Sequence, residues 1–343
     1  MRLLIFTQKV DRDDPVLGFF HTWIKKLASK AESVSVICLE KGGFDLPPNV
    51  TVYSLGKENG VGKLGYVWNL YKYLFLIRGS YDKVFVHMNQ EYVLLAGLYW
   101  KLARIPVYLW RNHPHGSLLT IVASLFSTRL FYTSPQSFTA RFKKARRMPA
   151  GIDTSVFCSQ EGAIRKKYSV CMVGRISPIK HVDLALWAIN MFVVRGGQIS
   201  FSIAGPVLDK DQEYYEKIRE YVVEHNLSSC VHFTPALSQD KLPKIYSSHE
   251  VCLNLTSVGS FDKTIVEAAA CGAIPLVSNE SLIGLLPPEC ITENSPEAVM
   301  ASLKKVLDPH LQVELSNKLA DFVKSQSLDS LLEKLVAELE QYV

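Results

Sequence analysis

The stretch NLTSVGSFDKTIVEAAACGAIPLVS (residues 254–278) contains the clearest structural pattern of the chain. Its first residues form an apolar strand, which leads into a loop of glycine and serine, a short helix of small residues and a second strand. The alanines and Gly272 let that helix lie close to a sheet. A strand, a helix and a further strand in this order are typical of a parallel sheet. The stretch therefore predicts an α/β fold.

The same alternation of strands and helices runs through the rest of the chain. In the first half we expect strands at Leu3–Phe6, Ser33–Cys38, Lys83–Val86, Val107–Trp110 and Leu130–Thr133, and helices near 17–31, 64–78, 92–103, 118–126 and 137–144. In the second half we expect strands at 170–173, 200–204, 230–233, 251–255 and 274–277, and helices at 182–194, 212–226, 241–247, 264–270 and beyond 296. Between them, MPAGIDTSVF (148–157) reads as a linker. The pattern predicts two doubly wound domains that face a cleft.

The composition excludes several classes of protein. Of the 343 residues, 48% are apolar and 21% are charged, which is the balance of a globular protein with room for two domains. The seven cysteines are scattered without a CxxC pair, which argues against a disulfide framework or a zinc site and suits a reducing cytoplasm. The apolar run at 92–100 is too short to span a membrane. Because no GxGxxG follows the first strand, a dinucleotide dehydrogenase is disfavoured.

Charge is divided unevenly between the two halves. Residues 1–160 hold 21 basic and 10 acidic side chains (net +11), whereas residues 161–343 hold 17 and 23 (net −6). This asymmetry predicts that the first half meets an anionic surface. The basic string at 141–147 and the aromatic helix near 65–79 lie in that half and are candidates for membrane docking. The alternative interpretation is that the string is a solvated helix end and the helix is part of the core.

A second stretch, VGRISPIKHVDLALWA (residues 173–188), is a candidate anion site. A buried strand ends in Gly174, and a loop with the cations Arg175 and Lys180 leads into a helix. Gly174 lets a ligand approach the backbone, and the helix start offers free N–H groups to an anion. Arg175 can bind phosphate oxygens in a bidentate manner, while Lys180 adds a point charge. The alternative is an ordinary solvated loop between a strand and a helix.

Glu267, in the stretch 254–278, has two interpretations. A carboxylate in the first turn of a helix is stabilised by the helix dipole, which is a structural role. Alternatively, Glu267 accepts hydrogen bonds from the two ribose hydroxyls of a nucleotide, with the N–H groups of the loop from Gly259 to Lys263 facing a phosphate or a sugar.

Taken together, these two stretches resemble glycosyltransferase family 4, a retaining family with the GT-B fold. The segments PAGIDTSVF (149–157), SIAGP (202–206) and VHFTPA (231–236) resemble further parts of that family. The resemblance implies a GT-B protein made of two Rossmann-like domains. Residues 1–150 would form the acceptor-side domain and residues 151–320 the donor domain. Residues 321–343 would form a helix that packs back toward the first domain.

The resemblance also implies roles for residues of the donor domain. Arg175 and Lys180, beside Gly174, would hold the donor diphosphate, and Glu267 would bind the ribose. The loop from Thr234 to Leu237 would lie beside the edge of the nucleobase. The family often has a first glutamate where this chain has Gly259, so contact with the transferred sugar would fall to Ser260, Phe261 and Asp262.

Two sites in the first domain follow from the same resemblance. A histidine at the end of a strand would lie near the reacting sugar, and His113 is the closer match, with His115 as the fallback. Either histidine has an alternative interpretation as a turn cap or a solvated side chain. The loop after the first strand would touch donor and acceptor through Gly18, its single glycine. Asp11 and Asp13 form a DxD string that we interpret as a coincidence, so no metal site is expected.

The implied activity is metal-independent transfer of a sugar, with retention, from a UDP- or GDP-linked donor to an acceptor hydroxyl. The expected acceptor is a sugar or a lipid-linked glycan in cell-surface polysaccharide or glycolipid synthesis. We expect no cofactor beyond the nucleotide sugar and no nucleic acid partner. The expected location is the cytoplasm, peripheral on the inner face of the membrane. The alternatives are a non-catalytic nucleotide-sugar-binding protein and a GT-B-like epimerase.

Overall fold

The protein divides into two compact units. In the computed structural model, which describes residues 1–14, 16–256 and 261–341, one unit comprises Met1–Pro149 together with Leu328–Val343, and the other comprises Ala150–Ser327. The chain therefore leaves the first unit once and returns to it with its last helix.

The first unit is built on a seven-stranded parallel sheet in the order β3-β2-β1-β4-β5-β6-β7. Its strands are β1 (Arg2–Val10), β2 (Ser33–Lys41), β3 (Val50–Ser54), β4 (Lys83–His87), β5 (Val107–Trp110), β6 (Arg129–Tyr132) and β7 (Ala145–Arg147). The strand order reverses between β1 and β4, which is where the chain switches from one side of β1 to the other.

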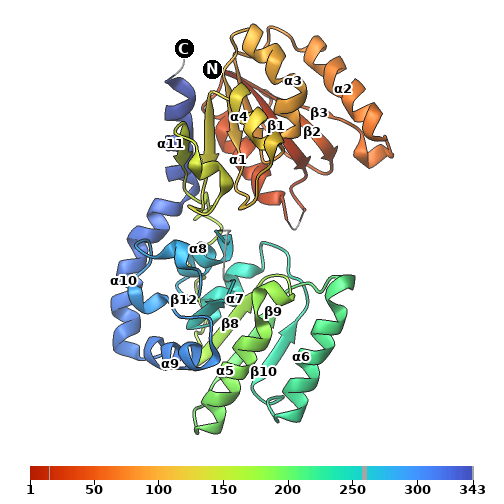
Figure 1. Cartoon of the computed structure of the whole chain (residues 1–343). Coiled ribbons are helices and arrows are strands. Elements are labelled where there is room, and N and C mark those ends of the chain that lie inside the picture. The colour runs from red at the N-terminus through yellow and green to blue at the C-terminus, as the bar shows by residue number, and fades with distance from the viewer. Residues whose placement is uncertain (15, 257–260, 342–343) are drawn as a thin grey trace. The chain divides into compact units, whose positions relative to one another are not determined.

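Helices cover both faces of this sheet (Figure 1). Side chains alternate along β1, so Leu3 and Ile5 join a core with α1 (Gly18–Ala28) and α11 (Leu328–Glu340). Leu4 and Phe6 join the opposite core. That core is covered by α2 (Lys63–Leu76), α3 (Glu91–Leu102) and α4 (Leu118–Phe126). Burial on both faces explains why Leu3–Phe6, within β1, is an unbroken apolar run.

The second unit has a five-stranded parallel sheet in the order β10-β9-β8-β11-β12. Its strands are β8 (Ser169–Val173), β9 (Ser200–Ala204), β10 (Val231–Thr234), β11 (Val251–Asn254) and β12 (Ile274–Val277). Its α-helices are α5 (Val182–Val194), α6 (Gln212–Glu224), α7 (Leu242–Ser248), α8 (Lys263–Ala270), α9 (Pro296–Val306) and α10 (Pro309–Gln326). The order reverses between β8 and β11, and crevices at such a switch point are where open α/β sheets bind ligands.

A close approach between two strand ends shapes this switch point. A Cβ atom at Gly205, just after β9, would lie 1.9 Å from the carbonyl oxygen of Gly174, just after β8. Side chains larger than hydrogen are therefore excluded at position 205. Gly174 itself has a φ of +139°, a conformation that favours glycine. The two glycines let the β8 and β9 loops run side by side.

One expected element is wrong and one observed element was not expected. The helix expected at 137–144 is a short 3-10 helix, Phe138–Arg141, followed by β7, because the chain pairs with β6 from Ala145 onward. The edge strand β3 was not expected, since it follows Pro47 and Pro48 and its side chains are at most half-buried. Both differences lie at the edges of the first sheet. Edge strands are less buried than central strands, so their sequences show a weaker apolar pattern.

Candidate functional site

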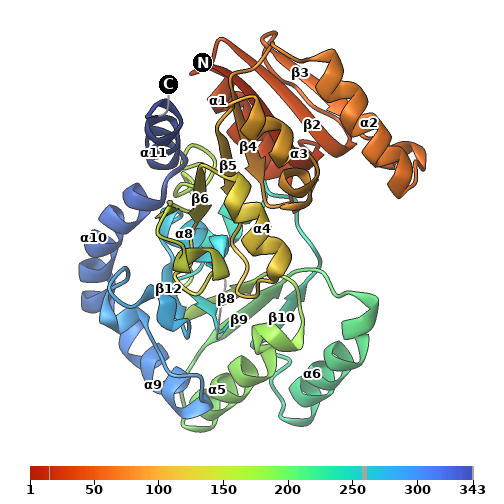
Figure 2. The same ribbon diagram turned by 45° about the horizontal axis from the view of Figure 1, so that its top comes forward.

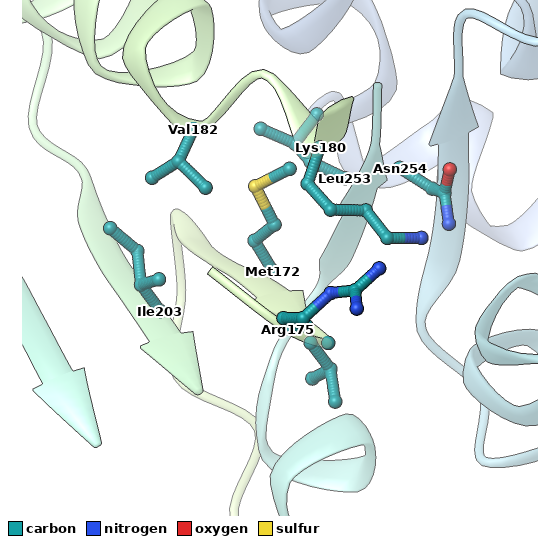
Figure 3. Close-up of a pocket in the computed structure, with 9 residues that line it drawn as sticks. Met172, Arg175, Lys180, Val182, Ile203, Leu253 and Asn254 are labelled. Carbon is teal, nitrogen blue, oxygen red and sulfur yellow. The ribbon is translucent and has the colours of Figure 1, made fainter. Parts of the chain in front are cut away.

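A small pocket opens at the carboxyl ends of β8 and β11. It is lined by Met172, Val173, Gly174, Arg175, Lys180, Val182, Ile203, Leu253 and Asn254. Its free volume is about 10 Å³, which is room for about one water molecule. In Figure 3 the charged ends of Arg175 and Lys180 point toward the same side of the pocket, with the Asn254 amide beside Lys180. The structure thus brings together the two cations that the sequence singled out.

Asp262 holds Lys180 in place. Its Oδ2 atom accepts hydrogen bonds from Lys180 Nζ at 2.5 Å, Asn254 Nδ2 at 2.9 Å and Thr256 Oγ1 at 3.1 Å. Asn254 Nδ2 also donates to Thr264 Oγ1 at 3.0 Å. Charge-assisted bonds of this kind are short and strong. One carboxylate oxygen therefore joins the loop after β8 to the end of β11 and the start of α8.

The start of α5 contributes less to an anion site than expected. The backbone N–H of Asp183 already donates to the Tyr214 hydroxyl at 3.0 Å, and that hydroxyl donates to Asp183 Oδ1 at 2.8 Å. A carboxylate in the first turn also repels an incoming anion. The expectation that the helix start offers free N–H groups is therefore wrong for Asp183. The side chains of Arg175, which is exposed, and Lys180 remain as anion ligands.

Glu267 lies one residue further into α8 than expected. It is the fifth residue of the helix, whose first turn contains no acidic residue, so the interpretation of Glu267 as a dipole-stabilising residue of the first turn is wrong. The Tyr246 hydroxyl donates to Glu267 Oε2 at 3.2 Å. Burial raises the pKa of Glu267 to about 7, although the charge of Lys263 and the bond from Tyr246 oppose that rise. A carboxyl group with such a pKa is poised to change charge near neutrality.

The remaining donor-side residues end or follow β10, which is two strands from β8 in the sheet, or precede α8 in the sequence. Thr234 ends β10, and its carbonyl accepts the N–H of Gly205 at 3.2 Å; Leu237 follows in a half-buried position. Phe261 is buried in the core of the second unit. Gly259 and Ser260 lie outside the described residues.

His113 and Gly18 belong to the first unit. His113 is exposed, and its Nδ1 atom accepts the backbone N–H of His115 at 3.1 Å, which is the turn-capping arrangement of the alternative interpretation. Gly18 is buried at the start of α1, where a Cβ atom would lie 2.8 Å from the carbonyl oxygen of Arg12. Close packing therefore accounts for this glycine without a ligand.

The Asp11–Asp13 string, interpreted above as a coincidence, lies near Lys9. Lys9 Nζ is 3.4 Å from Asp11 Oδ2 and 2.9 Å from Asp14 Oδ2. Within the described residues, no group of three or more histidine, cysteine, aspartate or glutamate side chains is arranged to hold a metal ion.

Sequence reasoning missed three polar residues of the site: Tyr246, Asn254 and Thr256. Asn254 and Thr256 follow each other closely at the carboxyl end of β11. Polar residues directly after a buried strand of a parallel sheet are a usable signal, because that edge is where ligands bind. Tyr246 could not be found in this way, since its link to Glu267 depends on how α7 packs against α8.

Comparisons with known proteins identify relatives of this chain. Residues 157–329 match the family model described as "Glycosyl transferases group 1". No curated protein matches the sequence. Solved structures with the same fold include HepE of Anabaena in complex with UDP and glucose (TM-score 0.77, 17% identity, covering 99% of this chain and 100% of that chain). A glycosyltransferase of Rickettsia africae gives a TM-score of 0.79 at 13% identity, with coverage of 99% and 98%.

The match to WaaG, a glycosyltransferase involved in lipopolysaccharide biosynthesis, has a TM-score of 0.65 at 15% identity and covers 98% of this chain and 99% of that one. These similarities, with the two parallel sheets, confirm the expected GT-B fold.

We predict that Asp262→Ala destabilises the second unit. The substitution leaves Lys180, Asn254 and Thr256 without their shared acceptor, and an unsatisfied, largely buried polar group costs about 1–3 kcal/mol. Urea unfolding should therefore begin at a lower concentration than in the unmodified protein. Glu213→Ala, which removes an exposed partner of Lys217 on α6, is the control and should change little. Equal unfolding midpoints for both variants would contradict the role assigned to Asp262.

Proposed function

This chain belongs to the glycosyl transferases group 1 family, and from that premise we propose that it transfers a sugar from a nucleotide diphosphate sugar to an acceptor hydroxyl with retention at the anomeric carbon. The observation that carries the proposal is the pair of cations, Arg175 and Lys180, at the switch point of the second sheet. A loop with two converging cations at this point suits the diphosphate of the donor.

In the proposed reaction, the diphosphate gains negative charge as its bond to the sugar breaks. Lys180 stabilises that charge from a position fixed before the reaction begins, which is the efficient form of electrostatic catalysis, and Arg175 adds a second positive charge. Lys180 is already held by Asp262, so little reorganisation is required of it. On this proposal the two side chains perform the task for which other transferases use a metal ion.

Further residues complete the proposed donor site. Glu267 would accept hydrogen bonds from the ribose hydroxyls, and the segment from Thr234 to Leu237 would edge the base. The loop from Gly259 to Asp262 would face the transferred sugar. From the first unit, His113 would contribute to the sugar site.

UDP and GDP are the proposed donor nucleotides. The HepE structures, which contain UDP or UDP-glucose, support the first of these. WaaG supports an acceptor on the way to a cell-surface glycolipid. We therefore propose a sugar or a lipid-linked glycan as the acceptor and the cytoplasmic side of a membrane as the place of reaction.

We predict that Arg175→Ala and Lys180→Ala each weaken UDP or GDP binding about tenfold or more. Hydrogen bonds to charged groups contribute roughly 1.5–3 kcal/mol, and 1.4 kcal/mol is a factor of ten in affinity. Isothermal titration calorimetry with both nucleotides measures the effect. Arg219→Ala and Lys217→Ala, on the exposed face of α6, are matched controls that should bind as the unmodified protein does. Unchanged affinity in both loop variants would remove the diphosphate assignment.

We predict that recognition of the ribose depends on pH through Glu267. Because its pKa is raised to about 7 by burial, the carboxyl group loses its charge as the pH falls through 7 and becomes a poorer acceptor. The preference for UDP over 2′-deoxy-UDP should therefore be large above pH 7 and shrink below it. Comparing the two ligands cancels the titration of the phosphates themselves.

Glu267→Gln supplies the control for this pH dependence. The amide keeps an acceptor oxygen but cannot ionise, so the preference for the 2′-hydroxyl should be small and the same at each pH. A variant that keeps the full, pH-dependent preference would exclude Glu267 as the ribose ligand.

A further inference from the structure

The first unit exposes a large apolar surface on three neighbouring helices. More than half of the exposed large apolar side chains in the described part of the chain lie on α2, α3 and α4. They are Leu64, Trp68, Tyr71, Phe75, Leu76, Leu95, Leu98, Tyr99, Leu102, Leu118, Leu119, Ile121, Val122 and Leu125. Trp68 is 74% exposed and Leu102 is 76% exposed, so most of the surface of these two apolar side chains faces the solvent. Contiguous apolar surface of this extent marks an interaction site.

These helices form one continuous face. All three cover the same side of the first sheet, and both views show α3 beside α4 (Figures 1 and 2). The Tyr71 hydroxyl on α2 donates to the Leu95 carbonyl on α3 at 2.8 Å. A groove of about 670 Å³ lies along α2 and reaches Tyr99 of α3, and Trp68 and Phe75 are among the α2 residues that line it. We call α2, α3 and α4 together the apolar face.

Basic side chains surround the apolar face. Its exposed cations are Lys63, Lys72, Arg78, Lys101 and Arg104. Between residues 63 and 128 the only acidic residues are Asp82 and Glu91. Arg78 lies over the Phe75 ring at 4.1 Å, so its charged end borders the apolar groove. Aromatic and aliphatic side chains with a basic rim are the composition of surfaces that lie in the interface of an anionic bilayer.

The basic string at 141–147 is less suited to docking than its sequence indicates. Lys144 donates to the carbonyl groups of Ser124 and Ser127. Arg146 pairs with Glu338 at 3.4 Å, and Arg147 donates to the Thr133 carbonyl at 3.2 Å. These cations stabilise the first unit, so neutralising them would disturb its fold.

We propose that the apolar face docks the protein on an anionic lipid bilayer by partial insertion. Among the helices of the described residues, none is long and apolar enough to cross a membrane. The benefit of docking rests on the proposed function, because it brings the enzyme to a lipid-linked acceptor. The docking itself requires no turnover and can be tested without it.

A second copy of the chain is a poorer occupant of the apolar face. A two-fold contact places the same patch on both subunits, so the basic rim of one copy would meet that of the other. A bilayer rich in anionic lipid neutralises the same rim while it takes up the apolar side chains. Charge complementarity therefore favours the bilayer.

Vesicle co-sedimentation tests the proposal. The protein should bind vesicles of phosphatidylcholine and phosphatidylglycerol more strongly than vesicles of phosphatidylcholine alone, and high salt should weaken the binding without abolishing it. Two double variants should each reduce binding about tenfold or more. One combines Trp68→Gln with Leu102→Gln, and the other combines Arg78→Gln with Lys101→Gln. Trp187→Gln, which changes an exposed tryptophan on α5 of the second unit, is the matched control and should bind normally.

Fluorescence quenching, UDP affinity and the oligomeric state distinguish loss of docking from loss of the donor site or from self-association. Lipids brominated on their acyl chains should quench the fluorescence of Trp68, and Trp68→Phe should remove that quenching while keeping most of the binding. UDP affinity should be unchanged in all these variants, so loss of docking is distinguishable from failure of the donor site. Absence of vesicle binding at low salt, or binding unaffected by the paired variants, would overturn the proposal. A dimer in solution that the same variants dissociate would assign the apolar face to self-association instead.

Discussion

The ion pair between Lys180 and Asp262 is the interaction on which the donor-side site depends. In the second sheet, β8 and β11 are neighbours although they are far apart in the sequence, so their loops meet at the switch point. Each loop alone would present a flexible, solvated charge. The shared acceptor, Asp262 Oδ2, fixes the Lys180 ammonium to the polar end of β11 and to the first residues of α8. A preorganised cation of this kind favours a developing diphosphate charge.

The ion pair between Lys180 and Asp262 also gives a role to the carboxylate in the loop before α8, where this chain departs from the pattern of its family. The resemblance to the family implies a glutamate at the position of Gly259, which lies outside the described residues. Asp262 supplies a carboxylate three positions later, but its Oδ2 atom is directed at Lys180, Asn254 and Thr256. On our account Asp262 is therefore a positioning residue for Lys180 in addition to any contact with the sugar. Glu267, half-buried one turn further along α8 and bonded to Tyr246, keeps a separate role.

The sequence predicted the framework better than the contacts. Strand ends followed by glycine, such as Val173–Gly174, are visible because alternation and turn residues are local properties. The strand β7 depends on pairing with β6, and the link from Tyr246 to Glu267 depends on how α7 packs against α8; a single sequence reveals neither. The raised pKa of Glu267 is of the same kind, because burial results from packing. Membrane docking was expected from net charge, the basic string at 141–147 and the aromatic helix near 65–79. The part played by α3 and α4 is recognised only through the exposure of their apolar side chains on the fold.

The most direct test of the central claim is hydrogen–deuterium exchange with and without UDP. Ligand binding slows exchange where it suppresses local opening. The account predicts slower exchange in the loop from Gly174 to Val182 and in α8, with little change on the exposed face of α6. Slower exchange confined to segments remote from β8 and β11, with these two unchanged in saturating UDP, would contradict a donor site at the switch point of the second sheet.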